Sequence, residues 1–293
     1  LFGFGLLDLL FFNGDILTVY ALCGLLVLPF VRAGNRVLLL FAVLFALQPI
    51  ELVYLVGGLV NPRLQPLDLG SGAMFQAILP AQESGSWFDV AIAGLRYGLP
   101  VNFTWAIEHG RFTQTLFLFL LGLWIGRRRL LYDEGNNANV WRKVMLWSVV
   151  AFAVLCPLRY TVPQMFHAEC VSASLTVMLD MWKNLAMTFF YVSLLTWAYH
   201  RTRARHVLAK ILPYGKMSLS NYLGQSVVGG FVFYHWGLGL YAVSGHTMSL
   251  VLGAAFVLLQ FSFCKLWLRL HRRGPLEQVW HNLTWVGSDR RKK

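Results

Sequence analysis

Residues 116–129 read LFLFLLGLWIGRRR, an apolar run that stops at three consecutive arginines. Apolar runs of about 20 residues match the thickness of a bilayer's hydrocarbon core when they are helical. Arg and Lys left at one end of such a run mark the cytoplasmic side. The same arrangement recurs along the chain, with basic clusters near 32–36, 127–143, 201–216 and 265–273. This pattern predicts an all-α, polytopic transmembrane helix bundle.

The composition supports the same class. Of the 293 residues, 57% are hydrophobic and only 13% are charged, whereas soluble domains carry roughly 25% charged residues. The net charge of +12 would indicate a nucleic-acid partner in a soluble protein. Here the basic residues are explained as topology signals and contacts to anionic lipid. We therefore expect membrane lipids as partners and no nucleic acid.

The connections between apolar runs alternate in character. The basic clusters alternate with acidic and Pro-containing connections near 13–15, 60–103, 163–171 and 241–246. One topology satisfies every connection, and it places these acidic connections outside. We expect one partial and about seven full crossings in a domain of residues 1–273. The outward loop 60–103 should hold an interfacial helix near Trp87–Tyr97.

The two ends of the chain differ from the rest. Residues 274–293 form an amphipathic tail, which we expect to be cytoplasmic and to lie along the membrane interface. The chain begins at Leu1 with an apolar run of about half a crossing, so we expect the natural N-terminus to lie upstream.

Ionisable side chains inside a membrane are costly and face the protein interior or water. On the inferred topology nearly all of them fall in the outward half of the bundle. We therefore expect an outward-facing polar cavity that mixes carboxylates and cations. The residues concerned are Asp8, Asp15, Glu51, Glu108, Arg111, Arg159, Asp180 and Lys183.

Helical spacing groups some of these residues. Glu108, Arg111 and Thr115 share a helix face. Asp180, Lys183, Asn184 and Tyr191 share another. Such groups are either structural ion pairs or parts of a substrate site, and paired carboxylates can act as general acid and base. His109 is the best-placed histidine, because it adjoins Glu108. The candidate catalytic residues are Asp15, Glu108, His109 and Asp180.

A second polar group lies in residues 216–226, which read KMSLSNYLGQS. Asn221 and Gln225 recur on one helix face, and amides in lipid seek partners on neighbouring helices. They either bind substrate or join helices. The candidate substrate-binding residues are Arg111, Lys183, Asn184, Asn221 and Gln225. The histidines lack metal-ligand spacing and the four cysteines form no motif, so we expect no metal.

Three stretches carry a family resemblance. Residues 11–24 read FFNGDILTVYALCG, residues 215–226 read GKMSLSNYLGQS, and residues 273–280 read RGPLEQVW. In order and spacing they resemble the YeiB-like family of uncharacterised bacterial inner-membrane proteins, domain of unknown function 418. The resemblance implies a multi-pass protein of the bacterial inner membrane.

The family is more distantly similar to membrane acyltransferases that move acyl groups from a cytoplasmic thioester onto an outward-facing sugar. This kinship implies an acyltransferase-like activity on an envelope glycan or lipid, with acyl-coenzyme A as a candidate donor. Many members carry a His shortly before the GDIL segment, where this chain reads LLDL at residues 6–9. A His-dependent mechanism would therefore need Asp8 in its place or a base upstream.

Two other functions remain open at this point. The chain fits a transporter or exporter of a small polar solute, in which Pro49 and Pro157 allow helices to bend. It also fits a membrane scaffold without chemistry, in which all the charge pairs are structural. The substrate, small or lipid-linked, and the oligomeric state are not determined by the sequence.

Overall fold

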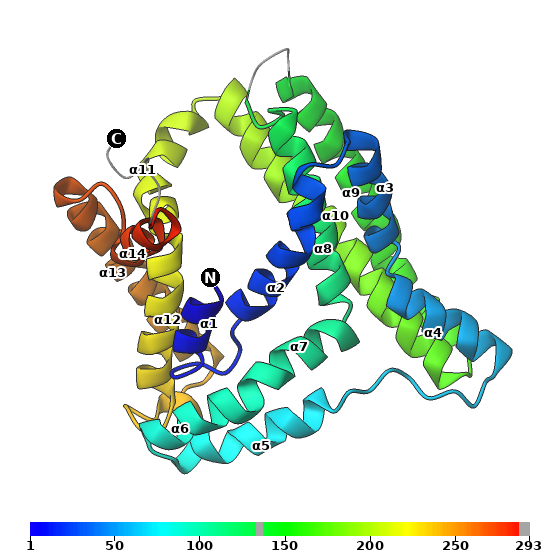
Figure 1. Ribbon diagram of the computed structural model, residues 1–293, viewed down its shortest axis with the longest axis horizontal. Helices are drawn as coiled ribbons and strands as arrows, with labels where there is room; N and C mark the ends of the chain where they lie inside the picture. The colour runs from blue at the N-terminus through cyan, green and yellow to red at the C-terminus, as the bar shows by residue number, and fades with distance from the viewer. Residues whose placement is uncertain (133–136, 287–293) are drawn as a thin grey trace. The chain divides into compact units, whose positions relative to one another are not determined.

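The computed structural model describes residues 1–132 and 137–286, and within them every regular element is a helix (Figure 1). The predicted all-α class is thereby confirmed. The chain forms two compact units. Unit 1 combines Leu1–Thr18, Gly72–Pro100 and the residues from His206 onward, whereas unit 2 combines Val19–Ser71 and Val101–Arg205. The expected division at residue 273 into a membrane domain and a tail stays a prediction.

Unit 1 is built around α12, which packs against α1 and α14. Its small apolar core joins Phe4, Leu17 and Leu219. The helices that lie wholly or mostly in this unit are α1 (Phe2–Asp8), α5 (Ser71–Ser84), α6 (Trp87–Ala93), α11 (Ala204–Lys216), α12 (Ser218–Phe233), α13 (His246–Leu270) and α14 (Pro275–Thr284).

The loop predicted over residues 60–103 is largely helical. The helix expected near Trp87–Tyr97 is present as α6 followed by a π-helical turn, Gly94–Gly98. A capping box starts α6: the Ser86 hydroxyl accepts from the Asp89 N–H, and the Asp89 carboxylate accepts from the Ser86 N–H at 2.8 Å. The Ser86 hydroxyl and backbone N–H hold the pKa of Asp89 below its usual value. Helix α5 was not expected, because Pro80 and several polar residues obscure its pattern.

Unit 2 has a larger core. Helices α9 and α10 run side by side, α3 packs on α8, and α4 packs on α10 (Figure 1). Buried side chains such as Val19, Leu38, Leu120 and Met181 fill the interior. The unit's helices are α2 (Leu17–Val27), η1 (Leu28–Val31), α3 (Asn35–Ala46), α4 (Pro49–Val60), α7 (Leu99–Glu108), α8 (Arg111–Arg127), α9 (Asn137–Thr161) and α10 (Glu169–Arg201).

Two helix breaks meet inside unit 2. Helices α3 and α4 are bent by 46° at Gln48, which has a φ of 54° and precedes Pro49. Proline lacks an N–H and disfavours helical geometry in the residue before it, so the kink expected at Pro49 is confirmed. Helices α7 and α8 break at Gly110, with a φ of 64°. A Cβ on Gly110 would lie only 2.9–3.1 Å from the Gln48 amide, so the two breaks pack against each other.

The expected number of crossings is wrong. Among the described residues, two helices are long and apolar enough to cross a membrane, Asn137–Met165 and His246–Leu270, or three if α3 and α4 form one bent span. The other expected crossings are shortened or interrupted. The run from Thr104 to Gly126 is divided at Gly110, and helix α10 carries Asp180 and Lys183 along its length.

Arg127, the first arginine after the apolar run at residues 116–126, bonds to the end of η1. The Arg127 guanidinium donates to the carbonyls of Phe30, Val31 and Ala33 at 2.7–3.1 Å. It thus adds side-chain hydrogen bonds to carbonyls at the end of η1, as basic groups do at helix C-termini. The amphipathic helix expected in the tail is present as α14, and residues 287–293 of that tail lie outside the described residues.

Candidate functional site

The four candidate catalytic residues are divided between the units. Asp15 belongs to unit 1, whereas Glu108, His109 and Asp180 belong to unit 2. The local surroundings of each one show what its side chain already does.

Asp15 caps a helix. Its side chain is 2% exposed, and its oxygens accept from the backbone N–H groups of Leu17 at 2.9 Å and Thr18 at 2.8 Å. The Tyr222 hydroxyl lies 3.4 Å from the same carboxylate. A carboxylate at a helix N-terminus satisfies free N–H groups and interacts well with the helix dipole. Asp15 therefore has a structural role at the start of α2.

The expected pairing of Glu108 with Arg111 is wrong. Gly110 ends the helix between them, so the two side chains do not share a face. Glu108 instead accepts from the N–H of Leu69 at 2.5 Å and from the Ser71 hydroxyl, which fastens the loop before α5. Arg111 donates to the Gln114 side chain at 2.8 Å.

His109 is exposed and faces its own helix. Its Nδ1 lies 3.0 Å from the Trp105 carbonyl, and its ring stacks on the Trp105 ring at 4.9 Å. The Nδ1 atom of His109 is therefore occupied by a contact within its own helix. This geometry gives no sign of an acid–base partnership with Glu108.

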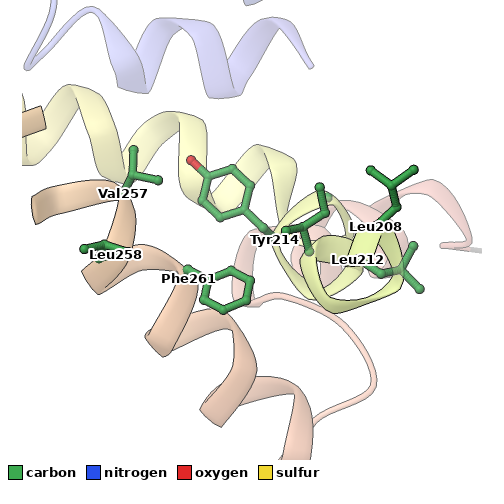
Figure 2. Close-up of a pocket in the computed structure, with 8 residues that line it drawn as sticks. Leu208, Leu212, Tyr214, Val257, Leu258 and Phe261 are labelled. Atoms are coloured by element: carbon green, nitrogen blue, oxygen red, sulfur yellow. The ribbon is translucent and has the colours of Figure 1, made fainter. Parts of the chain in front are cut away.

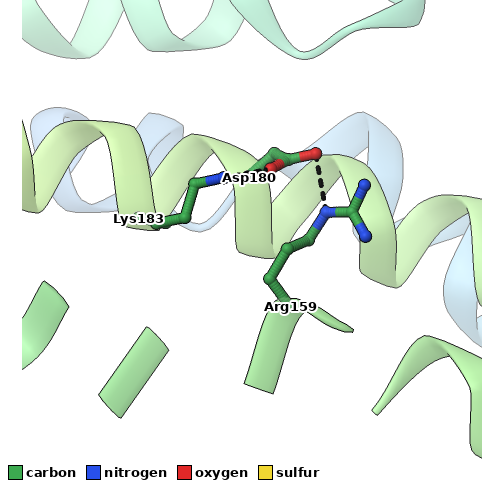
Figure 3. Close-up of polar contacts among 3 residues, drawn as sticks. All are labelled: Arg159, Asp180 and Lys183. Atoms are coloured by element: carbon green, nitrogen blue, oxygen red, sulfur yellow. Dashed lines mark hydrogen bonds and ion pairs between the residues drawn. The ribbon is translucent and has the colours of Figure 1, made fainter. Parts of the chain in front are cut away.

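Asp180 is the centre of a charge cluster (Figure 3). It binds the Arg159 Nε at 2.7 Å and the Lys183 Nζ at 2.8 Å. The Asp180–Lys183 pair predicted from spacing is confirmed, and Arg159 joins it from α9. Asn184 is partly buried at the next position of α10. Both cations bind the one carboxylate, as expected for a structural ion pair, and the cluster keeps a net charge of +1.

The amides of α12 join three helices. Gln225 Nε2 donates to the Tyr214 hydroxyl of α11 at 2.9 Å and to Gln260 Oε1 of α13 at 3.0 Å. Gln260 Nε2 donates to the Asn221 carbonyl at 2.9 Å, and Asn221 Nδ2 donates to the Tyr214 carbonyl at 3.0 Å. This geometry fits the helix-joining interpretation of Asn221 and Gln225. Gln260 was not singled out, since it stands alone in an apolar run.

Two of the family-like stretches meet in unit 1. Glu277 of α14 accepts from the N–H groups of Leu219 at 2.8 Å and Ser220 at 3.0 Å, at the start of α12. Its second oxygen accepts from the Ser220 hydroxyl. In the structure these two stretches therefore form a joint between α12 and α14.

A second pocket, of about 280 Å³, lies beside α12. Its lining is largely apolar and includes Phe12 and Phe233, and its polar members are Tyr222, Gln225, Ser226 and Tyr234. The Tyr234 hydroxyl also accepts from Gln82 of α5 at 3.1 Å. The pocket thus offers several groups that can donate to or accept from a bound hydroxyl compound.

Asp8 lies behind this pocket and is 1% exposed. Neither of its oxygens makes a hydrogen bond of normal geometry within residues 1–132 and 137–286, although the Ser226 and Tyr222 side chains lie near it. A buried carboxylate without full pairing is costly, and such groups concentrate at functional sites. Asp8 is therefore the strongest acid–base candidate in unit 1.

An apolar pocket of about 700 Å³ lies between α11 and α13 (Figure 2). Tyr214 is its polar member, and its hydroxyl bonds to Gln225 and Gln260. Since Gln225 lines the pocket beside α12, the Tyr214–Gln225 hydrogen bond joins the linings of the two pockets. The apolar lining comes from Leu208, Ile211, Leu212, Val257, Leu258 and Phe261.

Comparison with known proteins agrees with the motifs. The model of a family described as "Protein of unknown function (DUF418)" matches residues 125–287. The chain is 28% identical to the uncharacterized protein YxaH of Bacillus subtilis, over 94% of this chain and 67% of YxaH. It is 26% identical to the uncharacterized protein YeiB of Escherichia coli, over 94% of this chain and 71% of YeiB.

A third relative is an uncharacterized 39.9 kDa protein from the amylase 3' region of Bacillus acidopullulyticus. It is 25% identical over 97% of this chain and 69% of its own length. No solved structure matches the chain. Because the family model covers more than half of the residues and the relatives include YeiB itself, the chain belongs to the YeiB-like DUF418 family.

Proposed function

We propose that this protein transfers an acyl group onto a hydroxyl group of an envelope glycan or lipid. The observation that carries this proposal is the Tyr214–Gln225 hydrogen bond, which joins the linings of the two pockets, together with the buried carboxylate of Asp8. The pocket between α11 and α13 would hold the acyl chain. The pocket beside α12 would hold the acceptor.

In this reaction the acceptor oxygen attacks the carbonyl carbon of a thioester such as acyl-coenzyme A. A C–O bond forms, the C–S bond breaks, and the acceptor proton passes through the Ser226 hydroxyl to the Asp8 carboxylate. Asp8 then returns a proton to the thiolate that leaves. The Tyr222 and Tyr234 hydroxyls would donate to the oxyanion that develops on the carbonyl oxygen.

The setting proposed for this chemistry is the bacterial inner membrane. Helices α9 and α13 are apolar enough to cross it. By the positive-inside rule, the basic residues after α13 support a cytoplasmic position for that end of the helix and for α14 in this proposal. Membrane lipids and a small or lipid-linked acceptor are the partners that this proposal requires.

The test uses the full-length protein in nanodiscs with isotope-labelled acyl-coenzyme A and envelope lipids, followed by mass spectrometry. Labelled product is expected from the wild type, and Asp8→Asn should lower its rate about 100-fold or more, as for loss of a general base. Glu83→Gln, which removes an exposed carboxylate of α5, is the matched control and should leave the rate unchanged.

Absence of label in a folded protein with intact donor would refute acyl transfer. Solute transport would then be the next hypothesis, to be tested by flux in proteoliposomes. Equal rates for Asp8→Asn and the wild type would refute the assignment of the base.

A further inference from the structure

Unit 2 contains a small cavity that none of the proposed chemistry uses. Its volume is about 40 Å³, and it lies where α4, α10 and the end of α7 meet the loop before α5. Two carboxylates face it, from Glu51 and Glu108, together with Tyr54 and Ser174. The cavity is large enough for an ion with one or two waters, since one water occupies roughly 10–15 Å³ on this measure.

Glu51 is buried without a partner. Its side chain is 4% exposed, and neither oxygen makes a hydrogen bond of normal geometry with any residue that the structure describes. Because the break at Gln48 starts a new helix, Glu51 falls in the first turn of α4, where the helix dipole favours a negative charge.

Glu108 is held at the same cavity by the chain around it. Its carboxylate accepts from the Leu69 and Ser71 N–H groups and from the Ser71 hydroxyl, so its position is fixed. These are neutral donors, and they leave its charge in place. Two carboxylates that face one small cavity repel each other unless a cation or a proton compensates them.

The lining of the cavity contains no basic side chain. Among the basic residues of unit 2, Arg111 donates to Gln114, while Arg159 and Lys183 bind Asp180. The two carboxylates therefore depend on a cation or a proton from the solvent for compensation.

We propose that this cavity binds a small hard cation between Glu51 and Glu108, with Ca²⁺ matching the charge of the two carboxylates. Hard cations take oxygen ligands, and carboxylate, hydroxyl and water oxygens are the ones this lining can supply. Within the described residues no three His, Cys, Asp or Glu side chains cluster, so neutral oxygens must complete the shell. Two carboxylates alone imply a weak site, with a Kd of about 0.1–1 mM.

The first test measures the melting temperature of the full-length protein in a chelated, sodium-free buffer to which CaCl₂, MgCl₂ or NaCl is added. At 10 mM Ca²⁺ the wild type should gain about 3–5 °C by mass action. Glu51→Gln should lose this gain. It should also be at least as stable as the wild type without cation, because it replaces a buried unpaired charge by a neutral group.

The second test places a probe in the cavity. Terbium replaces calcium at oxygen sites, and its luminescence is excited by a neighbouring tyrosine, here Tyr54. Emission should appear with wild-type protein, fall strongly with Tyr54→Phe, and disappear with Glu51→Gln. Tyr54→Phe should nevertheless keep its Ca²⁺-dependent gain in melting temperature, while Glu83→Gln should match the wild type in both measurements.

A gain with Na⁺ in place of Ca²⁺, lost in Glu51→Gln, would support the site with a monovalent ion. No response to any of the three cations, or an equal response in Glu51→Gln, would overturn the proposal. If Glu51→Gln does not fold, Glu51→Asp serves instead. Its shorter carboxylate should raise the Kd for the cation at least tenfold, and an unchanged Kd would overturn the proposal. None of these measurements depends on acyl transfer.

Discussion

The Ser220 hydroxyl at the start of α12 donates to the Glu277 carboxylate of α14 at 2.5 Å. The Leu276 N–H in turn donates to the Ser220 oxygen at 3.1 Å. The same carboxylate accepts two backbone N–H groups of α12. The stretches at residues 215–226 and 273–280 are thus halves of one hydrogen-bonded joint, with a carboxylate from α14 acting as the N-terminal cap of α12.

Replacing this cap should loosen both helices. Glu277→Gln removes the charged acceptor from the start of α12, and loss of such a cap costs about 1–2 kcal/mol of folding free energy. Hydrogen exchange should accelerate at the amides of Leu219 and Ser220 and along α14. Gln278→Ala, on the exposed side of α14, is the control and should change stability by less than about 0.5 kcal/mol.

The Asp180 cluster should show coupled energetics. Asp180→Asn leaves Arg159 and Lys183 unpaired, and we expect a loss of about 1–2 kcal/mol, because the Asp180 side chain is 35% exposed and water screens the pair. The double variant Asp180→Asn with Arg159→Met should lose less than the sum of the two single losses. Strict additivity in reversible unfolding would show that the two side chains do not interact.

The amide network should make α13 depend on α12. Gln260→Leu deprives Gln225 of an acceptor and the Asn221 carbonyl of a donor, at a cost of about 0.6–2 kcal/mol for an interhelical bond in a membrane protein. Adding Gln225→Leu to this variant should lower the free energy of unfolding only a little further, because both side chains belong to the same hydrogen-bond network. A proximity label between α12 and α13 should report the loosening, and an unperturbed α13 would contradict this prediction.

The capping box of α6 predicts an acid-sensitive helix start. The pKa of Asp89 is lowered in the folded state by the Ser86 hydroxyl and N–H. Stabilisation by ionised Asp89 is therefore fully present above its unfolded pKa of about 4 and is lost as the pH falls through the lower folded pKa. Hydrogen exchange at the start of α6, corrected for intrinsic rates, should rise below pH 4. In Ser86→Ala this protection should already be weak at neutral pH, with a smaller change on acidification.

Sequence spacing predicted contacts inside continuous helices and failed across breaks. Asp180 and Lys183 are three positions apart in α10 and form their pair as expected. Glu108 and Arg111 have the same spacing, yet Gly110 between them adopts a left-handed conformation and turns them apart. The glycine was visible in the sequence. Its conformation depends on packing against Gln48, which no local pattern contains.

Partners from other helices could not be read from the chain. Arg159 reaches Asp180 from α9, and Gln260 reaches Gln225 from α13. Each is a single polar residue in an apolar run, so periodicity gives no partner. Helix α11 was missed for a related reason, because its basic residues were interpreted as a cytoplasmic connection.

The unpaired carboxylates show the same limit. Asp8 and Glu51 were expected inside the membrane because they interrupt apolar runs, and both are buried. Their lack of partners is a property of the packed neighbours. The candidate site therefore shifts from Asp15, which caps a helix, to Asp8, which has no such task.

Unit 1 is made of three separate segments of the chain, so its parts are synthesised at different times. Asp15 and Tyr222, whose side chains meet there, are separated by 207 positions, and the whole of unit 2 lies between them in the chain. A ribosome adding about 5–20 residues per second needs roughly 10–40 s to span that interval. During synthesis α1 and Asp8 are therefore made long before α12, and the packing that buries this acid against α12 can form only after that interval.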